Sequence, residues 1–388
     1  FMITHGREPA NPRPVDMAKL FHYADKYTIG SLIYSEGIND DFNKVVFSAL
    51  EWDPHTDIHQ IAREYARYFH GARLEEDIAQ GVFNLERNWR GPLLSNAEVD
   101  NTFTQFRRME QRATPQELLN WRFQQLLYRA YFDYYVKTRL LYETTLERQA
   151  LEILRGAGRM GSMVAMNEAE QVLDRAVTLP IGQDLRSRLY ELAAAQYQSI
   201  RAQLTVDRYR AKSVSRGATL DSVDTPLNNR HYWKRRFAEL RQVPDELTRL
   251  DKIEQLLRRT DPGPGGFYDD LGNPDRQPHL DGVLPFEQDP ANYHSPRSNS
   301  LALGATAGAR SVDAIRPDGA AQFLNYPVEW WTFAETRFEW PLTMRYRDLD
   351  REHTYKLRVV YLSRRKDEAR IRLVANRTIE IHPYLRKP

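Results

Sequence analysis

Residues 28–50 read TIGSLIYSEGINDDFNKVVFSAL, and this stretch decides how the first part of the chain is interpreted. The apolar run at residues 28–34 has the length and composition of a buried β-strand, and a helical pattern follows from residue 45. Three carboxylates lie where the predicted strand ends and the helix begins: Glu36, Asp40, Asp41. In parallel α/β folds the strand ends are rigid and the loops above them vary, so a functional site is expected at this junction.

The residues before this stretch continue the same alternation. Residues 2–4 read as the end of a strand, a polar turn follows at residues 5–8, and residues 14–25 form a helical pattern with proline in the first turn. Strand, helix, strand and helix in this order are typical of a parallel α/β sheet or barrel. Two strands alone do not form a stable sheet, so either further strands precede residue 1 or these elements dock on another structure. We expect residues 1–55 to be the C-terminal part of a (β/α)8 barrel.

The composition is that of a multidomain globular protein. The 388 residues exceed one ordinary domain, and 41% hydrophobic with 28% charged residues is typical of globular chains. A net charge of +2 argues against a dedicated nucleic-acid binder, and no apolar run is long enough to cross a bilayer. The absence of cysteine excludes disulfides and thiolate metal sites but does not exclude export. An aromatic content of 11% suits a sugar-binding protein, although aromatic residues also fill cores.

Residues 56–260 show helical periodicity almost throughout. Thr114, Pro115 and Glu117 have the spacing of a capping box with proline at the first helical position. The helix that follows carries an apolar stripe: Leu119, Phe123, Leu126, Ala130, Tyr134, Leu141. A second long helix, over residues 183–213, carries another stripe: Leu185, Leu189, Leu192, Ile200, Leu204. We expect these stripes to be buried in a helical bundle domain.

The last third of the chain has a different pattern. Residues 261–325 are rich in Gly, Pro, Asp and Asn, and we expect a long loop or linker that is ordered and packed at residues 265–272. Residues 326–388 alternate between apolar and polar side chains at these apolar positions: Leu342, Met344, Tyr346, Tyr355, Leu357, Val359, Tyr361, Ile371, Leu373. This period of two predicts strands of a partial β-sandwich, because the segment is shorter than a whole sandwich domain. We therefore expect the polypeptide to continue beyond residue 388.

Three parts of the chain together resemble large secreted bacterial glycoside-hydrolase-like proteins, most of which are uncharacterised. The parts are YSEG (34–37) with DDFNK (40–44), GGFYDDLG (265–272) with PHL (278–280), and WWT (330–332) with LTMRY (342–346). The resemblance implies a barrel end, a helical domain and a β-sandwich, together with secretion and action on a polysaccharide. It carries over site positions only at Glu36, Asp40 and Asp41.

Glu36 and Asp41 are the candidate catalytic pair. Glu36 directly follows the predicted strand, which is the usual place for the acid, base or nucleophile of a barrel enzyme. Glycosidases place two carboxyl groups about 5–5.5 Å apart for retention and about 6.5–9.5 Å apart for inversion. Each residue also has a structural alternative. Glu36 could form an ion pair or bind a sugar hydroxyl, and aspartate is favoured at a helix start for its capping and charge.

Seven further residues are candidates for substrate binding: His5, Arg7, Tyr34, Asp40, Asn43, Lys44, Tyr268. The first two follow a predicted strand end and would share a sheet edge with Glu36, where Arg7 could hold the carboxylate of a uronic acid. The helix residues could bond sugar hydroxyls, and Tyr268 could stack on a sugar ring. The structural alternatives are a surface ion pair, a helix N-cap, a solvated helix face and, for Tyr268, core packing.

Oxygen ligands for Ca²⁺ are available at Asp269, Asp270 and Asn273, but their spacing does not fit an EF-hand and turn formation explains them. The sequence therefore predicts no metal and no cofactor.

Together these patterns predict a secreted carbohydrate-active enzyme, extracellular or periplasmic, that hydrolyses glycosidic bonds with a carboxylate pair. One alternative is a non-catalytic carbohydrate-binding or structural protein built on a degenerate barrel. Another is a lyase or esterase, although the chain lacks the Gly-x-Ser-x-Gly elbow of esterases. The expected partner is a polysaccharide or oligosaccharide. Nucleic acid and membrane insertion are not expected, and a homo-oligomer is left open.

Overall fold

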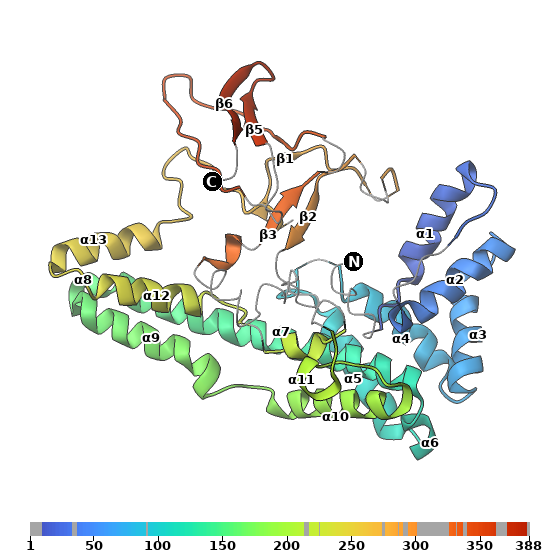
Figure 1. The fold of residues 1–388 in the computed structure, drawn as a ribbon. Helices are drawn as coiled ribbons and strands as arrows, with labels where there is room; N and C mark the ends of the chain where they lie inside the picture. The colour runs from blue at the N-terminus through green and yellow to red at the C-terminus, as the bar shows by residue number, and fades with distance from the viewer. Residues whose placement is uncertain are drawn as a thin grey trace. The chain divides into compact units, whose positions relative to one another are not determined.

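The computed structural model describes most of the chain, and every structural statement below concerns these residues. They are 10–32, 37–90, 92–212, 217–224, 226–273, 276–285, 287–289, 294–300, 326–330, 332–336, 340–361 and 371–385, with only the backbone described at 297–300. The chain divides into two compact units, Phe1–Arg347 and Asp348–Pro388, and each is described by itself. Figure 1 shows the elements coloured along the sequence.

The first helices pack against one another before the longest helix begins. They are α1 (Pro14–Ala24), α2 (Asp41–Trp52), α3 (Ile58–His70), α4 (Glu75–Arg87), α5 (Glu98–Arg112) and α6 (Pro115–Leu118), with 3-10 turns η2 (Asp25–Tyr27) and η3 (Ile38–Asp40). Local sequence explains where they begin. Asp57 caps α3 by accepting a hydrogen bond from the His59 amide, and Thr114 with Glu117 forms the predicted capping box of α6.

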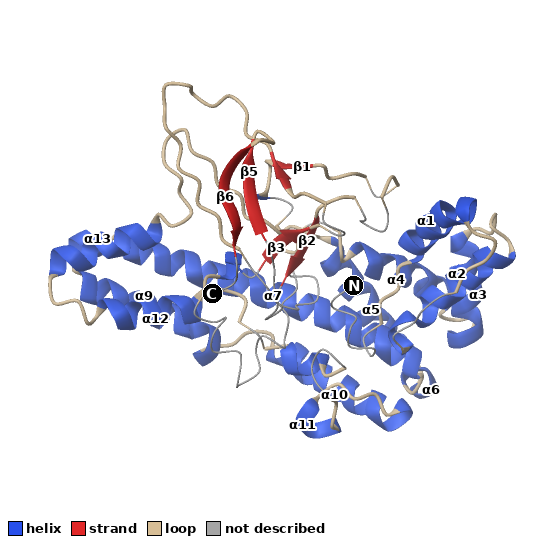
Figure 2. Ribbon diagram, turned by 45° about the horizontal axis from the view of Figure 1, so that its top comes forward, coloured by secondary structure: helices blue, strands red, loops and turns tan. Residues whose placement is uncertain are grey.

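The helix α7 (Trp121–Arg155) has 35 residues, and α5, α9 and α10 pack along it. Asn120 caps its first turn by accepting a hydrogen bond from the Arg122 amide. The later helices are α8 (Ala157–Met160), α9 (Ser162–Thr178), α10 (Gln183–Ile200), α11 (Val206–Tyr209), α12 (Arg230–Leu240) and α13 (Glu246–Leu257), with the 3-10 turn η5 (Thr219–Ser222). In Figures 1 and 2, α9, α12 and α13 lie side by side.

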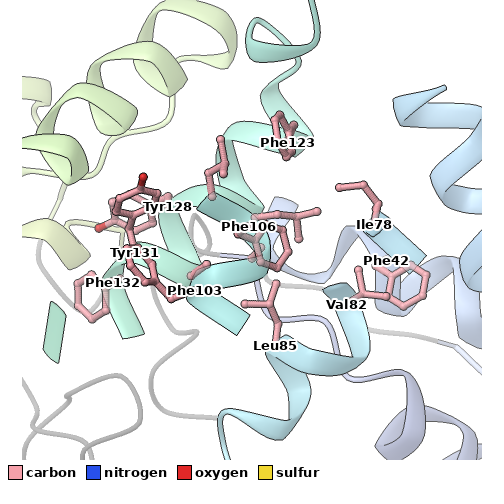
Figure 3. Close-up of a cluster of buried hydrophobic side chains, with 14 of the residues drawn as sticks. Phe42, Ile78, Val82, Leu85, Phe103, Phe106, Phe123, Tyr128, Tyr131 and Phe132 are labelled. Carbon is pink, nitrogen blue, oxygen red and sulfur yellow. The ribbon is translucent and has the colours of Figure 1, made fainter. Parts of the chain in front are cut away.

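Two apolar cores share the helix α7. The first lies around its N-terminal half and includes Phe103, Phe106 and Phe123, which Figure 3 draws with their neighbours. The second lies around its C-terminal half, where α9, α12 and α13 bury these residues among others: Leu146, Leu154, Leu173, Trp233, Phe237. Each core is built from stripes at helical spacing, which is what the periodicity of residues 56–260 predicts.

The helical prediction for residues 56–260 is confirmed, with corrections to the two stripes. Leu185, Leu189 and Leu192 are buried, and so are Phe123 and Leu126. Leu119 and Leu141 are exposed, by 74% and 46% respectively. The reason for the first is that residue 119 lies between α6 and α7 and is not part of the long helix. The predicted helix over residues 183–213 ends early, at Ile200, because residue 201 adopts a left-handed conformation.

Strands in the described part of the chain occur only as short antiparallel pairs. In the first unit, β1 (Leu280–Asp281) pairs with β4 (Thr343–Met344), and β2 (Arg297–Ser300) pairs with β3 (Thr332–Glu335), which follows the 3-10 turn η8 (Val328–Trp330). In the second unit, β5 (Ile371–Ala375) and β6 (Ile379–Leu385) form a hairpin. Figure 2 shows these strands in red.

The predicted fold class is therefore wrong. Helix makes up 58% of the structure and strand 6%, all in two-stranded sheets, so the barrel end and the β-sandwich are both absent from the described residues. The apolar run from residue 28 forms no strand as far as residue 32, and Ile29 and Leu32 are almost fully exposed. An apolar run becomes a buried strand only where neighbouring strands pair with it, and no described strand pairs with residues 28–32. The expected strand at residues 2–4 lies outside the described residues.

The alternating apolar residues of the C-terminal segment also do not form the predicted strands at residues 355–361. Tyr355, Leu357 and Tyr361 are exposed and lie outside any strand. A period of two is favourable only when a second layer covers the apolar face, and the described residues provide no such layer.

No helix within the described ranges has the length and apolar character required to cross a membrane.

Candidate functional site

The residues of the predicted site divide into two groups. Asp40, Asp41, Asn43, Lys44 and Tyr268 lie within the described residues. The other predicted positions lie outside them, so their placement is not described: His5, Arg7, Tyr34, Glu36.

Asp41 lies at the start of α2 and is held by two other helices. Its carboxylate accepts hydrogen bonds from Arg122 Nε at 2.8 Å and Nη2 at 3.2 Å, and from the Tyr65 hydroxyl at 2.7 Å. Burial, together with the neighbouring Asp41 carboxylate, raises the pKa of Tyr65 well above its usual value. A bidentate arginine keeps a carboxylate ionised and fixed, so these contacts favour the structural alternative for Asp41.

Asn43 fastens the segment before α1 to the helix α2. Its Oδ1 accepts a hydrogen bond from the Arg13 amide at 2.7 Å, and its Nδ2 donates to the Asn11 carbonyl at 2.8 Å. The same Nδ2 approaches Asp40 Oδ1 at 3.5 Å. The segments that directly follow residues 1–9 and 33–36 are thus hydrogen-bonded to each other. Lys44 is partly exposed on α2, as its solvated-face alternative expects.

A second polar cluster joins the Gly-rich loop to the short β1–β4 pair. Its centre is the Asp269 carboxylate, whose side chain is only 5% exposed. His279 Nδ1 lies 3.1 and 3.0 Å from the two carboxylate oxygens, and the His279 amide donates to Oδ1 at 3.2 Å. The Tyr346 hydroxyl donates to Oδ2 at 3.0 Å. One buried carboxylate therefore orients an imidazole and a phenol; we call these three residues the Asp269 cluster.

Aromatic rings surround the imidazole of this cluster. The His279 ring stacks on Tyr346 with ring centroids 4.7 Å apart, and Phe267 meets it edge-on at 4.9 Å. Phe267 is 39% exposed and the His279 side chain 22%, so the cluster borders solvent. Burial and the Asp269 charge raise the pKa of Tyr346 to about 12, so its hydroxyl stays protonated at neutral pH.

The chemical capacity of the cluster follows from its hydrogen bonds. An ionised carboxylate only accepts, so Nδ1 of His279 must carry the proton that it shares with Asp269. The other ring nitrogen, Nε2, then has a free lone pair, and it has no hydrogen-bond partner among the described residues and is not enclosed. A histidine held by a carboxylate through one nitrogen can accept and return a proton at the other, which is the arrangement of a general base or acid.

Backbone pairing explains why these distant residues meet. The strands β1 and β4 pair Leu280 with Met344, and the Arg345 amide donates to the His279 carbonyl at 2.8 Å. The turn that carries Asp269 is fixed from its other side. Asp270 is buried, its pKa is raised by that burial, and its carboxylate accepts hydrogen bonds from Asn273 and from Thr332, the first residue of β3.

Tyr268 has different neighbours from the residues of the Asp269 cluster. Its neighbours are Arg276, Asp270 and Glu329, and burial is the main reason that its pKa rises to about 12. The contacts of Tyr268 do not include Asp41.

The Asp269 cluster was not predicted as a site from the sequence. Its three residues all fall within the blocks that carry the family resemblance, yet nothing in their spacing indicates contact. Within the described ranges, no group of three or more His, Cys, Asp or Glu side chains is placed to hold a metal ion.

Comparisons with protein-family models, with curated proteins and with solved structures gave no match to this chain.

Proposed function

We propose that the protein is a carbohydrate-active enzyme in which His279 transfers a proton during cleavage of a glycosidic bond. The observation that carries the proposal is the Asp269 carboxylate that holds His279 through Nδ1 and leaves Nε2 accessible. Acid–base catalysis needs a group within hydrogen-bond reach of the reacting atoms, held in one tautomer. The cluster supplies such a group.

The surroundings of the imidazole support a sugar as the substrate. The half-exposed Phe267 ring and the stacked Tyr346 ring offer apolar faces next to polar atoms. A pyranose presents the same combination, with C–H groups on its faces and hydroxyls at its edge, and aromatic rings suit such a ligand. The likeness of this loop and of the LTMRY block to glycoside-hydrolase-like proteins points in the same direction.

Proton transfer is thus assigned to His279 and not to the predicted carboxylate pair of Glu36 and Asp41. Asp41 already accepts three hydrogen bonds, two of them from Arg122, and a carboxylate held in this way is a weak candidate for proton transfer. The Nε2 atom of His279 has no hydrogen-bond partner within the described ranges of the chain.

Non-catalytic carbohydrate binding is the second candidate. Hydrolysis needs one group to protonate the leaving oxygen and another to activate water or attack the sugar. Among the described residues, the Asp269 cluster offers one proton-transfer group, because the raised pKa of Tyr346 makes its hydroxyl a poor acid at neutral pH. A binding site would need only the rings and the hydrogen-bonding groups.

The experiment measures reducing ends released from a panel of polysaccharides that includes xylan, laminarin and polygalacturonate. On the substrate that is cleaved, His279→Ala should lower kcat by roughly 10²- to 10⁴-fold with little change in affinity. His353→Ala is the matched control, because His353 also contacts an aspartate, Asp350, but on an exposed surface. Binding without cleavage by the wild type would favour the second candidate. Neither binding nor cleavage across the panel would contradict both.

A further inference from the structure

The start of α1 gathers enclosed polar atoms that have no hydrogen-bond partner. Three of them are donors: Asn11 Nδ2, Arg13 Nε, Arg129 Nη2. Asn11 is 2% exposed and Arg129 is 1% exposed. Enclosed donors in native proteins are nearly always bonded, so each unbonded donor needs a physical explanation. Two of these donors belong to residues 10–13, and the third belongs to Arg129, which contacts the same stretch at Ala10. We infer that an acceptor for them is missing.

Arg129 reaches this stretch from α7. Its Nε donates to Asp133 Oδ1 at 2.7 Å, its Nη1 lies 3.4 Å from the Ala10 carbonyl, and its guanidinium covers the Trp89 ring at 4.2 Å. The other Asp133 oxygen accepts from Asn88 at 3.0 Å. Arg129 is therefore held through Nε, Nη1 and the face of its guanidinium group. Its Nη2 atom is left without an acceptor.

The second guanidinium, that of Arg13, has no ion-pair partner in the described part of the chain. The backbone around it is held firmly, because the Arg13 amide donates to Asn43 Oδ1 and the Asn11 amide donates to the Asn39 carbonyl at 3.0 Å. Arg13 is only partly buried, so it links the enclosed donors to solvent. The backbone that carries the Asn11 and Arg13 side chains is thus fixed.

The carboxylates nearby that the structure describes already have hydrogen-bond or ion-pair partners. Glu86 accepts from the amides of Val15 and Asp16 at the first turn of α1, at 3.0 and 2.9 Å. Asp16 lies 3.5 Å from Arg90, and Asp133 is paired with Arg129. An acceptor for the three donors must therefore come from outside these groups.

We propose that Asn11, Arg13 and Arg129 form a binding site for a small oxyanion, either a carboxylate or a phosphate. Guanidinium forks match the paired oxygens of both groups, and the amide of Asn11 adds a directional donor. A buried water could accept two of the hydrogen bonds, but it carries no negative charge to pair with Arg13, which has no ion-pair partner among the described residues. The site is separate from the Asp269 cluster, and it does not depend on the proposed function.

Two probes distinguish the sources of such an oxyanion: inorganic phosphate and glucuronate, each titrated by calorimetry into the full chain at constant ionic strength. We expect one of them to bind with 1:1 stoichiometry. Binding of phosphate alone would indicate a free phosphate or phosphoryl ligand, and binding of glucuronate alone would indicate a sugar acid. A wild-type protein that binds neither probe would overturn the proposal, and water would then be the occupant.

Variants locate the binding. Arg13→Gln should weaken it at least tenfold, and Asn11→Ser should weaken it by a smaller factor. Arg90→Gln is the matched control, because Arg90 is a half-exposed arginine nearby that is paired with Asp16 and Glu86, and it should bind the probe as the wild type does. Equal affinity in Arg13→Gln and the wild type would overturn the proposal. Since Arg13 makes no side-chain ion pair in the described residues, its replacement is expected to leave the fold intact, which circular dichroism checks.

Discussion

The helical region, residues 10–257, and the loop-and-strand region, residues 261–347, both enclose carboxylates but give them different partners. In the helical region, Asp41 is paired with Arg122 and Asp133 with Arg129. In the loop-and-strand region the buried Asp269 faces His279 and Tyr346 instead. Guanidinium does not release its proton, whereas imidazole exchanges one near neutral pH.

This difference indicates that the residues that stabilise the fold and the residue proposed to transfer a proton lie in different regions of the chain. The Asp41–Arg122 pair joins α2 to α7, the Asp133–Arg129 pair lies within α7, and the apolar stripes around them supply two cores. The described part of the loop-and-strand region contributes no residue to either core, yet it holds the imidazole whose Nε2 has no hydrogen-bond partner among the described residues. We therefore expect substitutions in the two cores and in the buried ion pair of α7 to change stability, and substitutions in the Asp269 cluster to change function.

The largest effect is expected at the buried ion pair of α7. Arg129→Met should lower the free energy of unfolding by about 3–5 kcal/mol, because it leaves the Asp133 carboxylate enclosed without its charge partner. Urea denaturation measures the change. The double variant Arg129→Met with Asp133→Leu should recover most of the loss. A single variant as stable as the wild type would show that the pair is not enclosed as described.

A core leucine should come next. Leu189→Ala removes a fully buried side chain of α10 and should cost about 2–5 kcal/mol. Leu119→Ala is the matched control, since this leucine is 74% exposed and its truncation should change stability by less than about 0.5 kcal/mol. Equal losses in the two variants would contradict the boundary between α6 and α7.

His70 makes the helical region sensitive to pH. Burial lowers its pKa to about 4, so between the usual value of 6.5 and 4 the unfolded chain binds a proton that the folded chain does not. Its contribution to stability is therefore complete above pH 6.5 and decreases as the pH falls to 4, by at most about 3 kcal/mol.

Comparing variants isolates this contribution from that of other titrating groups. His70→Leu should flatten the fall in unfolding free energy between pH 6.5 and 4, whereas His55→Gln, at an exposed position, should leave it unchanged. If His70→Leu loses stability with acid as steeply as the wild type, the buried neutral imidazole is not the cause.

The smallest effect on stability is expected at Gly272, in the turn after Asp269. Its φ of +95° disfavours other residues, and an added Cβ would overlap the backbone nitrogen of Phe333 and lie 2.6 Å from its carbonyl oxygen. Gly272→Ala should displace the turn from β3, lower activity on a cleaved polysaccharide, and leave the helical content by circular dichroism unchanged. A variant of full activity would show that the turn does not position Asp269.

The sequence predicts the helices well because the information for them is local. The stripe of Leu185, Leu189 and Leu192 and the capping box at Thr114 lie within a few turns of chain, and both are found in the structure. The strand predictions are wrong because an alternating or apolar pattern forms a strand only where a neighbouring strand pairs with it. The apolar run that begins at residue 28 pairs with nothing in the described part of the chain and stays exposed at Ile29.

The candidate site could not be predicted for a similar reason. His279 and Tyr346 are brought together by the antiparallel register of β1 and β4, which are each two residues long. Neither strand has a pattern that distinguishes it from a loop, so the sequence contains the residues of the cluster without indicating their contact. The predicted role of Asp41 was weighed against a structural one, and its contacts with Arg122 and Tyr65 favour the latter.

The most direct measurement is the tautomer of His279, observed by long-range ¹H–¹⁵N correlation NMR above the usual histidine pKa of about 6.5, with His279→Gln to assign the signal. The wild type should show a protonated Nδ1 and an unprotonated Nε2, because the Asp269 carboxylate accepts the Nδ1 proton. Asp269→Ala should remove this preference. A wild-type imidazole protonated at Nε2, or one unchanged by Asp269→Ala, would contradict the claim that Asp269 prepares His279 for proton transfer.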